Sequence, residues 1–207
     1  SIGLTNFGRY WIRIAERSPP PRLVVLTRGA QNKIQDPAKL ERRSPEEPLV
    51  YMFSSGSTGR PKRVARTHGQ LRGEAEYYDW MGITPEDRIF CTIPLFHTYG
   101  MGCCMVAATR TGATLVLLED PNPFLLRRQR AMELIETEGV TIYPGVPFNF
   151  RLMAEAPASA DLSSIRLAFS AGTALPRPFF DAFLEKFDVP VRQLYGCTEA
   201  GTLTANL

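Results

Sequence analysis

The chain has 207 residues, of which 44% are hydrophobic and 22% charged, a composition that excludes intrinsic disorder and suffices for one sizeable α/β domain. Its formal net charge of +3 gives no indication of nucleic-acid binding, and no apolar run approaches the roughly 20 residues that span a bilayer. Four cysteines without CxxC spacing and two histidines exclude the usual zinc patterns and favour a reduced, cytoplasmic setting.

Residues 1–48 are predicted to form a lead-in of helix, strand and linker. Residues 22–27 (RLVVLT) are apolar and β-branched, which indicates a buried strand. Residues 28–48 are polar, charged and contain proline, which is typical of a linker. A second apolar run, 49–53 (LVYMF), predicts another buried strand and opens the second region, 49–207.

Strand-like and helix-like segments alternate along this second region. Thr67 is predicted to cap a helix that runs to about Met81, with Leu71, Ala75 and Tyr78 on one face. Further segments follow in chain order: strand 88–93, helix 99–109, strand 114–118, helix 124–138, strand 140–143, helix 147–156, strand 165–169, helix 177–187 and strand 191–195. This alternation predicts an α/β fold with a mostly parallel sheet and helices on both of its faces.

Five loops rich in glycine, serine, threonine and proline each follow one of the predicted strands. In open parallel sheets, ligands bind at the edge formed by the carboxyl ends of the strands. We therefore expect one composite site, built from Ser54–Lys62, Pro94–Gly100, Tyr143–Pro147, Ser170–Leu175 and Gly196–Thr202.

The first of these loops suits a polyphosphate. Its hydroxyls and glycine backbone amides match phosphate oxygens, and they come from Ser54, Ser55, Gly56, Ser57, Thr58 and Gly59. Positive charge is added by a basic cluster of Arg60, Lys62, Arg63 and Arg66. A Walker A loop is excluded, because Pro61 stands where the second glycine is required. Glycine–serine clusters are also common in ordinary surface turns, so this loop alone does not establish a nucleotide site.

The segment 51–62 (YMFSSGSTGRPK) resembles the signature of the AMP-binding superfamily, which includes acyl-CoA synthetases, aryl-CoA ligases, luciferases and peptide-synthetase adenylation domains. Its continuation and three later segments resemble family motifs in the family's order: THGQL at 67–71, PLFHTYG at 94–100, SAGTALP at 170–176 and YGCTE at 195–199. One serine–glycine loop is weak support, whereas four ordered motifs at loop positions are strong. The resemblance covers roughly residues 49–207.

The resemblance implies an enzyme that activates a small carboxylic acid with ATP and Mg²⁺. The carboxylate attacks the α-phosphorus of ATP, pyrophosphate leaves, and the resulting acyl-adenylate loses AMP to a thiol, either that of CoA or that of a carrier protein. Catalysis of the first step consists mainly of positioning the reactants and neutralising the phosphate charge.

The resemblance also implies roles for individual residues. Ser54–Lys62 holds the β- and γ-phosphates, with Lys62 among the catalytic groups. Thr198 donates its hydroxyl to the α-phosphate, and Glu199 binds Mg²⁺. The residues implied to bind the adenine end are Tyr195, Gly196, Gly172 and Thr173. Taken singly, Tyr195 would be an ordinary core aromatic residue and Glu199 an ordinary helix-start carboxylate.

His97 lies within PLFHTYG, where the resemblance places it at the carboxylate or acyl pocket as a catalytic residue, although a lone histidine is commonly a structural hydrogen-bonding group. Amino-acid-activating members usually carry aspartate at this position, so His97 favours a fatty or aryl acid. Tyr99, Met101 and Phe148 are candidates for lining an apolar tunnel and equally for core positions. His68 is interpreted as structural.

Two alternatives to a complete ligase stay open. Ser170 lies in AFSAG, which resembles the nucleophile elbow of a serine hydrolase, but no histidine follows His97 to complete that chemistry. The family's ribose-binding TGD motif, its hinge and its small C-terminal domain with the adenylation lysine are not found after Glu199. The chain is therefore expected to be an excised piece that lacks this domain, and the alternative function is that of an inactive nucleotide-binding fragment.

Overall fold

The computed structural model describes residues 44–54, 61–118 and 122–206. The strand predicted at 22–27 and the rest of the lead-in as far as residue 43 lie outside these ranges. No helix of the described part is long and apolar enough to cross a membrane.

A six-stranded sheet forms the centre of the molecule, in the order β4-β3-β5-β6-β7-β8. All its pairs are parallel except the last, in which β8 runs antiparallel to β7. This confirms the predicted mostly parallel sheet. The strands are β3 (Arg88–Cys91), β4 (Thr114–Leu117), β5 (Ile142–Gly145), β6 (Leu167–Ser170), β7 (Val191–Cys197) and β8 (Gly201–Ala205).

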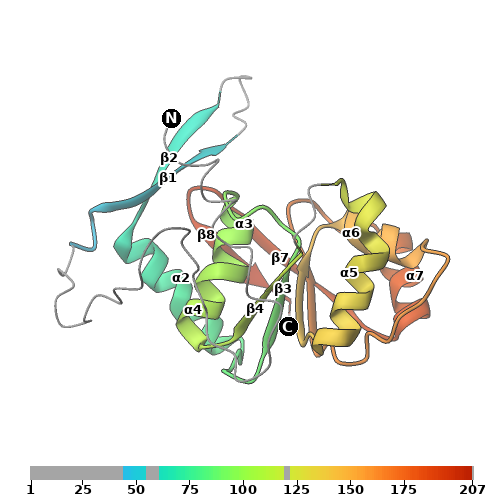
Figure 1. Cartoon of the computed structure of the whole chain (residues 1–207). Coiled ribbons are helices and arrows are strands. Elements are labelled where there is room, and N and C mark those ends of the chain that lie inside the picture. Colours follow the sequence, from blue (N-terminus) through green and yellow to red (C-terminus); the bar gives the residue numbers. More distant parts are fainter. Residues whose placement is uncertain (1–43, 55–60, 119–121, 207) are drawn as a thin grey trace.

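Helices cover both faces of this sheet, as predicted (Figure 1). Successive strand residues alternate between two apolar cores, because side chains along a strand point to opposite faces. Phe90 and Tyr143 pack with one core and Ile89 and Ile142 with the other. The first core is shared with α5 (Phe124–Glu138), α6 (Pro147–Ala154) and α7 (Arg177–Phe187). The second is shared with α2 (His68–Trp80), the π-helical turn η2 (Met101–Val106) and α4 (Ala107–Thr111).

Helix α2 begins where Thr67 was predicted to cap it. The Thr67 hydroxyl accepts a hydrogen bond from the Gln70 amide at 3.2 Å, and the Thr67 amide donates to the Gln70 side chain at 3.0 Å. This reciprocal capping box satisfies amides that the first turn leaves free. The buried face of the helix contains Leu71 and Tyr78 as expected, but its third member is Glu74. A buried carboxylate on this face was not predicted.

The single helix predicted at 99–109 is wrong in detail. Three short segments replace it: α3 (Thr98–Gly100), then η2, then α4. Glycines let this stretch pack tightly, since a Cβ on Gly100 would lie 2.4 Å from the Pro94 carbonyl oxygen and one on Gly102 would lie 2.3 Å from a Glu74 carboxylate oxygen.

The strand predicted at 49–53 exists but belongs to a different sheet. β1 (Pro48–Ser54) pairs antiparallel with β2 (Lys62–Thr67), and this two-stranded hairpin is separate from the parallel sheet. The expected burial is also wrong, because β1 packs through Met52 on one face while its other face is exposed, at Leu49, Tyr51 and Phe53. β1 therefore does not end at the carboxyl edge of the parallel sheet, although the sequence had predicted this for the strand before this loop.

A polar network ties the strands together at the amino edge of the sheet. Asp87, 3% exposed, accepts hydrogen bonds from Arg166 at 2.8 and 2.6 Å and from the Thr141 hydroxyl at 2.7 Å. The Thr84 amide donates to the same carboxylate at 2.9 Å. Although burial alone would raise the pKa of Asp87, the hydrogen bonds from Arg166, Thr141 and Thr84 lower it below its ordinary value.

We expect Asp87→Asn to lower the free energy of unfolding by about 2 kcal/mol at neutral pH, because hydrogen bonds to a buried charged group are lost. The folded-state pKa is depressed, so the carboxylate stabilises the fold above its ordinary pKa of about 4 and this contribution disappears as the pH falls through the folded-state value. Urea unfolding of both proteins at several pH values measures the difference. Asp181→Asn, at the exposed ion pair with Arg177, is the matched control and should have a much smaller effect, because exposed ion pairs contribute little to stability. A difference that persists unchanged in acid would contradict the assignment.

Candidate nucleotide-binding site

The parallel strands bring several predicted loops to one edge of the sheet. The ladder pairs Gly145 of β5 with Ser170 of β6, and Ser170 with Gln193 of β7. The segments after these strands therefore leave side by side. The predicted meeting of loops at the carboxyl edge is confirmed for these loops and for the loop after β3.

Tyr99 fastens three of these segments to one another. Its hydroxyl lies 3.1 Å from the carbonyl oxygen of Gly145 and 3.1 Å from that of Phe169. The ring is buried, and burial raises the pKa of Tyr99 well above its ordinary value, so the hydroxyl stays a donor. Tyr99 and Met101 are both buried and pack in apolar clusters, which favours a core position over a tunnel lining for each of them.

His97 is exposed at the start of the short helix α3. Its Nδ1 accepts a hydrogen bond from the Tyr99 amide at 3.2 Å, which caps the helix and fixes the ring. The accepting Nδ1 leaves the proton on Nε2 in the neutral ring. The side chain therefore has a structural bond on one nitrogen and an exposed donor on the other.

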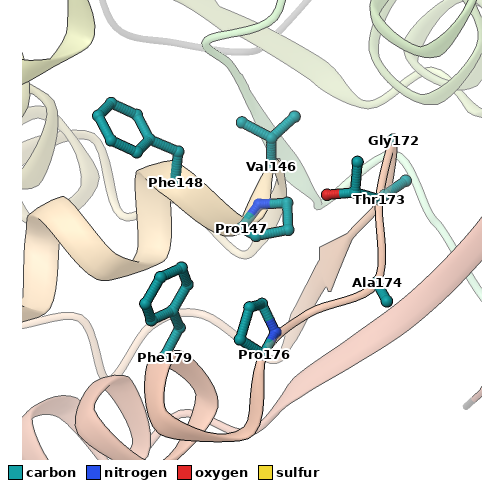
Figure 2. A pocket seen from close by; sticks show the side chains of 9 residues that line it. Val146, Pro147, Phe148, Gly172, Thr173, Ala174, Pro176 and Phe179 are labelled. Atoms are coloured by element: carbon teal, nitrogen blue, oxygen red, sulfur yellow. The ribbon is translucent and has the colours of Figure 1, made fainter.

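A hollow of about 480 Å³ lies between the start of α6 and the loop after β6. Figure 2 shows Val146, Pro147 and Phe148 on one side and the Gly172–Pro176 loop with Phe179 on the other. Gly172 has φ +89°, a left-handed conformation that favours glycine, and this lets the loop turn back across the strand end. Gly172 and Thr173 thus line a largely apolar pocket, and the half-exposed Phe148 belongs to its wall.

Gln193 supports this loop and was not foreseen as a site residue. Its side-chain oxygen accepts a hydrogen bond from the Leu175 amide at 3.1 Å. Because Gln193 lies on β7, two residues before Tyr195, it links the loop that carries Thr173 to the strand that carries the aromatic ring. Gln193 follows the charged Arg192 in β7 (VRQLYGC), so nothing in the strand's own pattern marked it as a site residue.

The YGCTE segment crosses the end of β7 and the turn before β8. Tyr195 is 66% exposed, so it is not a core aromatic residue. Glu199 is exposed on the β7–β8 turn, so it is not a helix-start carboxylate. A Cβ on Gly196 would lie 2.4 Å from the Gly201 carbonyl oxygen, which explains the glycine at that position. Tyr195, Thr198 and Glu199 all lie at the same edge as the pocket loop.

The loop of Ser54–Lys62 is only partly described. Residues 55–60, which include Ser55, Gly56, Ser57, Thr58 and Gly59, lie outside the described residues. Ser54 and Lys62 are paired across the hairpin, so the two ends of the loop are adjacent. The hairpin projects away from the sheet (Figure 1). Lys62, the first residue of β2, is exposed.

Arg66 does not fit the basic cluster in which the sequence placed it. Its side chain is fully buried and forms an ion pair with Glu74 at 2.9 Å. It also lies 3.3 Å from the carbonyl oxygen of Thr198 and 3.2 Å from the hydroxyl of Thr98. The phosphate role predicted for this arginine is therefore wrong, because its guanidinium faces the interior.

The donor set at the edge fits a magnesium ion that arrives with a nucleotide. In the part of the chain that the structure describes, no three His, Cys, Asp or Glu side chains are grouped so as to hold a metal by themselves. Mg²⁺ in nucleotide sites usually takes one or two carboxylates together with phosphate oxygens and water. A single exposed carboxylate such as Glu199 matches that mode of binding.

Comparison with known proteins agrees with this architecture. The 3-hydroxybenzoate–CoA ligase of Aromatoleum sp. (strain CIB) is 32% identical over 213 residues, which cover 94% of this chain and 39% of the ligase. The 4-coumarate–CoA ligase 4 of Arabidopsis thaliana is 35% identical over 172 residues, covering 79% and 29%. An anthranilate CoA ligase, AuaEII, solved in complex with anthranoyl-AMP, superposes with a TM-score of 0.71 at 28% identity, over 78% of this chain and 32% of that one.

The chain spans about a third of the length of the ligases that it matches. The model of one protein family, described as AMP-binding enzyme, matches residues 10–207, which includes most of the lead-in as well as the motif-bearing region. With nearly the whole chain matched and the motifs in the family's order, the chain belongs to the AMP-binding enzyme family.

Proposed function

We propose that this chain forms the nucleotide-binding part of an acid–CoA ligase, which activates a carboxylic acid with ATP and passes the acyl group to CoA. The observation that carries the proposal is the meeting of the Gly172–Thr173 loop, Tyr195 and the Thr198–Glu199 turn at the carboxyl edge of one parallel sheet. Ligand sites of open parallel sheets occur at this edge.

In the proposed complex, each group has a task that suits its surroundings. The exposed Tyr195 ring covers one face of the adenine, with Gly196 beside it and Thr173 opposite. Thr198 donates its hydroxyl to the α-phosphate. Glu199 binds Mg²⁺, which neutralises phosphate charge when it is bound. The loop of Ser54–Lys62 holds the terminal phosphates, and His97 directs its Nε2 donor at the acid.

We propose an aromatic acid as the substrate class. The pocket beside Thr173 is walled by Val146, Phe148 and Phe179, and aromatic rings pack well against such surfaces. The similar ligases are named for hydroxybenzoate, coumarate and anthranilate. A fatty acid is the alternative that a panel of acids distinguishes, and a carrier-protein thiol is the alternative to CoA.

The serine hydrolase alternative is disfavoured by the geometry around Ser170. This serine is 1% exposed, and its hydroxyl has no hydrogen-bond partner among the described residues. The Nδ1 atom of His97 is engaged by the Tyr99 amide. A nucleophilic serine needs an adjacent base and access for its substrate, and neither condition is met here.

The test is acid-dependent exchange of pyrophosphate into ATP, measured with the full-length protein that contains this sequence. We expect exchange with benzoate, hydroxybenzoates and cinnamate derivatives, and thioester formation when CoA is added. Exchange with fatty acids alone would overturn the substrate class and leave the reaction in place. No exchange with either group of acids would overturn the proposed function.

A further inference from the structure

A buried ion pair lies between the β1–β2 hairpin, α2 and the β7–β8 turn. The side chains of Arg66 and Glu74 are 0% and 3% exposed and lie 2.9 Å apart. Burial of such a pair is weak evidence for stability, because removing two charges from water offsets most of their attraction and an apolar pair often packs as well. Stability alone therefore does not explain why a charged pair is buried at this position.

The guanidinium of Arg66 holds the backbone on both sides of Glu199. One terminal nitrogen lies 3.3 Å from the Thr198 carbonyl oxygen, and the other lies 3.4 Å from the Ala200 carbonyl oxygen. The first of these nitrogens also donates to the Thr98 hydroxyl, next to His97, at 3.2 Å. A planar guanidinium presents its donors in a fixed geometry, which a lysine ammonium does not. The turn is thereby oriented with the Glu199 side chain outward.

Glu74 completes the attachment from the other side. Its second carboxylate oxygen accepts hydrogen bonds from the Tyr78 hydroxyl at 3.0 Å and from the Thr202 amide at 3.3 Å. The fit is close, because a Cβ on Gly201 would lie 2.3 Å from a Glu74 oxygen. Each end of the β7–β8 turn is thus bonded to one member of the pair.

We propose that Arg66 is a positioning residue that fixes the Thr198–Glu199 turn relative to the hairpin and to the His97 segment. The importance of this positioning for catalysis rests on the proposed function. Arg66 lies near one end of β2, and Lys62 lies at the other. One side chain therefore joins three segments that each carry a proposed ligand group. Nothing in the sequence pattern distinguishes Arg66 from its exposed neighbours.

The test compares Arg66→Lys with the unsubstituted chain. Lysine keeps a cation beside Glu74 but cannot bond both turn carbonyls and Thr98 together. We expect amide hydrogens of residues 198–202 to exchange about tenfold faster, while those of α5 and α7 are unchanged. We also expect about tenfold weaker binding of ATP in the presence of Mg²⁺. Arg110→Lys, at the exposed pair with Asp79, is the matched control and should change neither measurement.

If Arg66→Lys does not fold because the buried charges are poorly paired, a second variant still tests the inference. The double substitution Arg66→Met with Glu74→Gln removes both charges and should show the same local loss of protection in a folded chain. Faster exchange throughout the chain, or none at 198–202, would overturn the positioning role. If the unsubstituted chain fails to bind ATP while the turn still responds to Arg66→Lys, the attachment is supported and the proposed function fails. If ATP binds and the turn does not respond, only this inference fails.

Discussion

Glu199→Gln is expected to reduce adenylate formation by about 100-fold in the full-length protein, because a charge that helps to neutralise the reacting phosphates is removed. In the 207-residue chain, the same change should abolish the part of ATP affinity that depends on Mg²⁺. The fold should be unaffected, since Glu199 is exposed on a turn and glutamine has the same shape. Calorimetric titration with ATP, with and without Mg²⁺, separates the two contributions to binding.

The control for this prediction is Glu136→Gln, an exposed carboxylate on α5. It changes the net charge of the chain by the same amount, so any general electrostatic effect on a trianionic or tetra-anionic ligand appears in both variants. An equal loss in both would show that Glu199 acts only through net charge. Unchanged Mg²⁺-dependent binding in Glu199→Gln would show that the metal is held elsewhere.

In the proposed site, one set of residues holds the loops in place and another set is exposed to a ligand. Tyr99, Gln193 and Arg66 are hydrogen-bonded to backbone groups and hold loops in place. Tyr195 and Glu199, in contrast, are exposed and are available to a ligand. Such a site is preorganised, because the loops are fixed by groups that the ligand does not touch.

Much of the parallel sheet and its helices follows from local sequence pattern. The helices predicted at 124–138 and 177–187 are found as α5 and α7 with the same bounds. Both have apolar residues at helical spacing and end at a residue with positive φ, Gly139 and Asp188. A helix that has apolar residues at helical spacing and ends at a residue with positive φ can be predicted from its local sequence alone.

The missed strands lack such a pattern. β2 (KRVART) and β8 (GTLTA) are mainly polar or small, and each is formed by antiparallel pairing with the strand before it. Their partners, β1 and β7, contribute the apolar side chains. A strand whose stability comes from its neighbour cannot be recognised from its own residues.

The internal charges were missed for a related reason. Arg66 and Glu74 are eight residues apart, and a charged residue is normally assigned to the surface. The carbonyl and amide groups that compensate for burying these charges belong to the β7–β8 turn, more than 120 residues later in the chain. The residues that organise the site are thus less visible in sequence than the residues that would touch the ligand.

Gly201→Ala is expected to lower the free energy of unfolding by about 2–4 kcal/mol and to weaken Mg²⁺–ATP binding more than tenfold. Two penalties combine at this position. The backbone has φ +75°, which strains any residue with a Cβ, and the added carbon would lie 2.3 Å from the Glu74 oxygen. Glu74 cannot move away without breaking its bond to Arg66, so the β7–β8 turn has to shift instead.

Gly139→Ala separates the two penalties. Gly139 has φ +57°, but a Cβ added there would meet no other atom within 4 Å, so this substitution carries backbone strain without a packing conflict. It should cost about 1 kcal/mol and leave ATP binding unchanged, whereas Gly201→Ala should affect both quantities. Thermal unfolding and ATP titration of the two variants measure this contrast. Equal effects on stability and binding would mean that the contact with Glu74 does not set the position of the turn, and the link between the buried ion pair and the nucleotide site would then be lost.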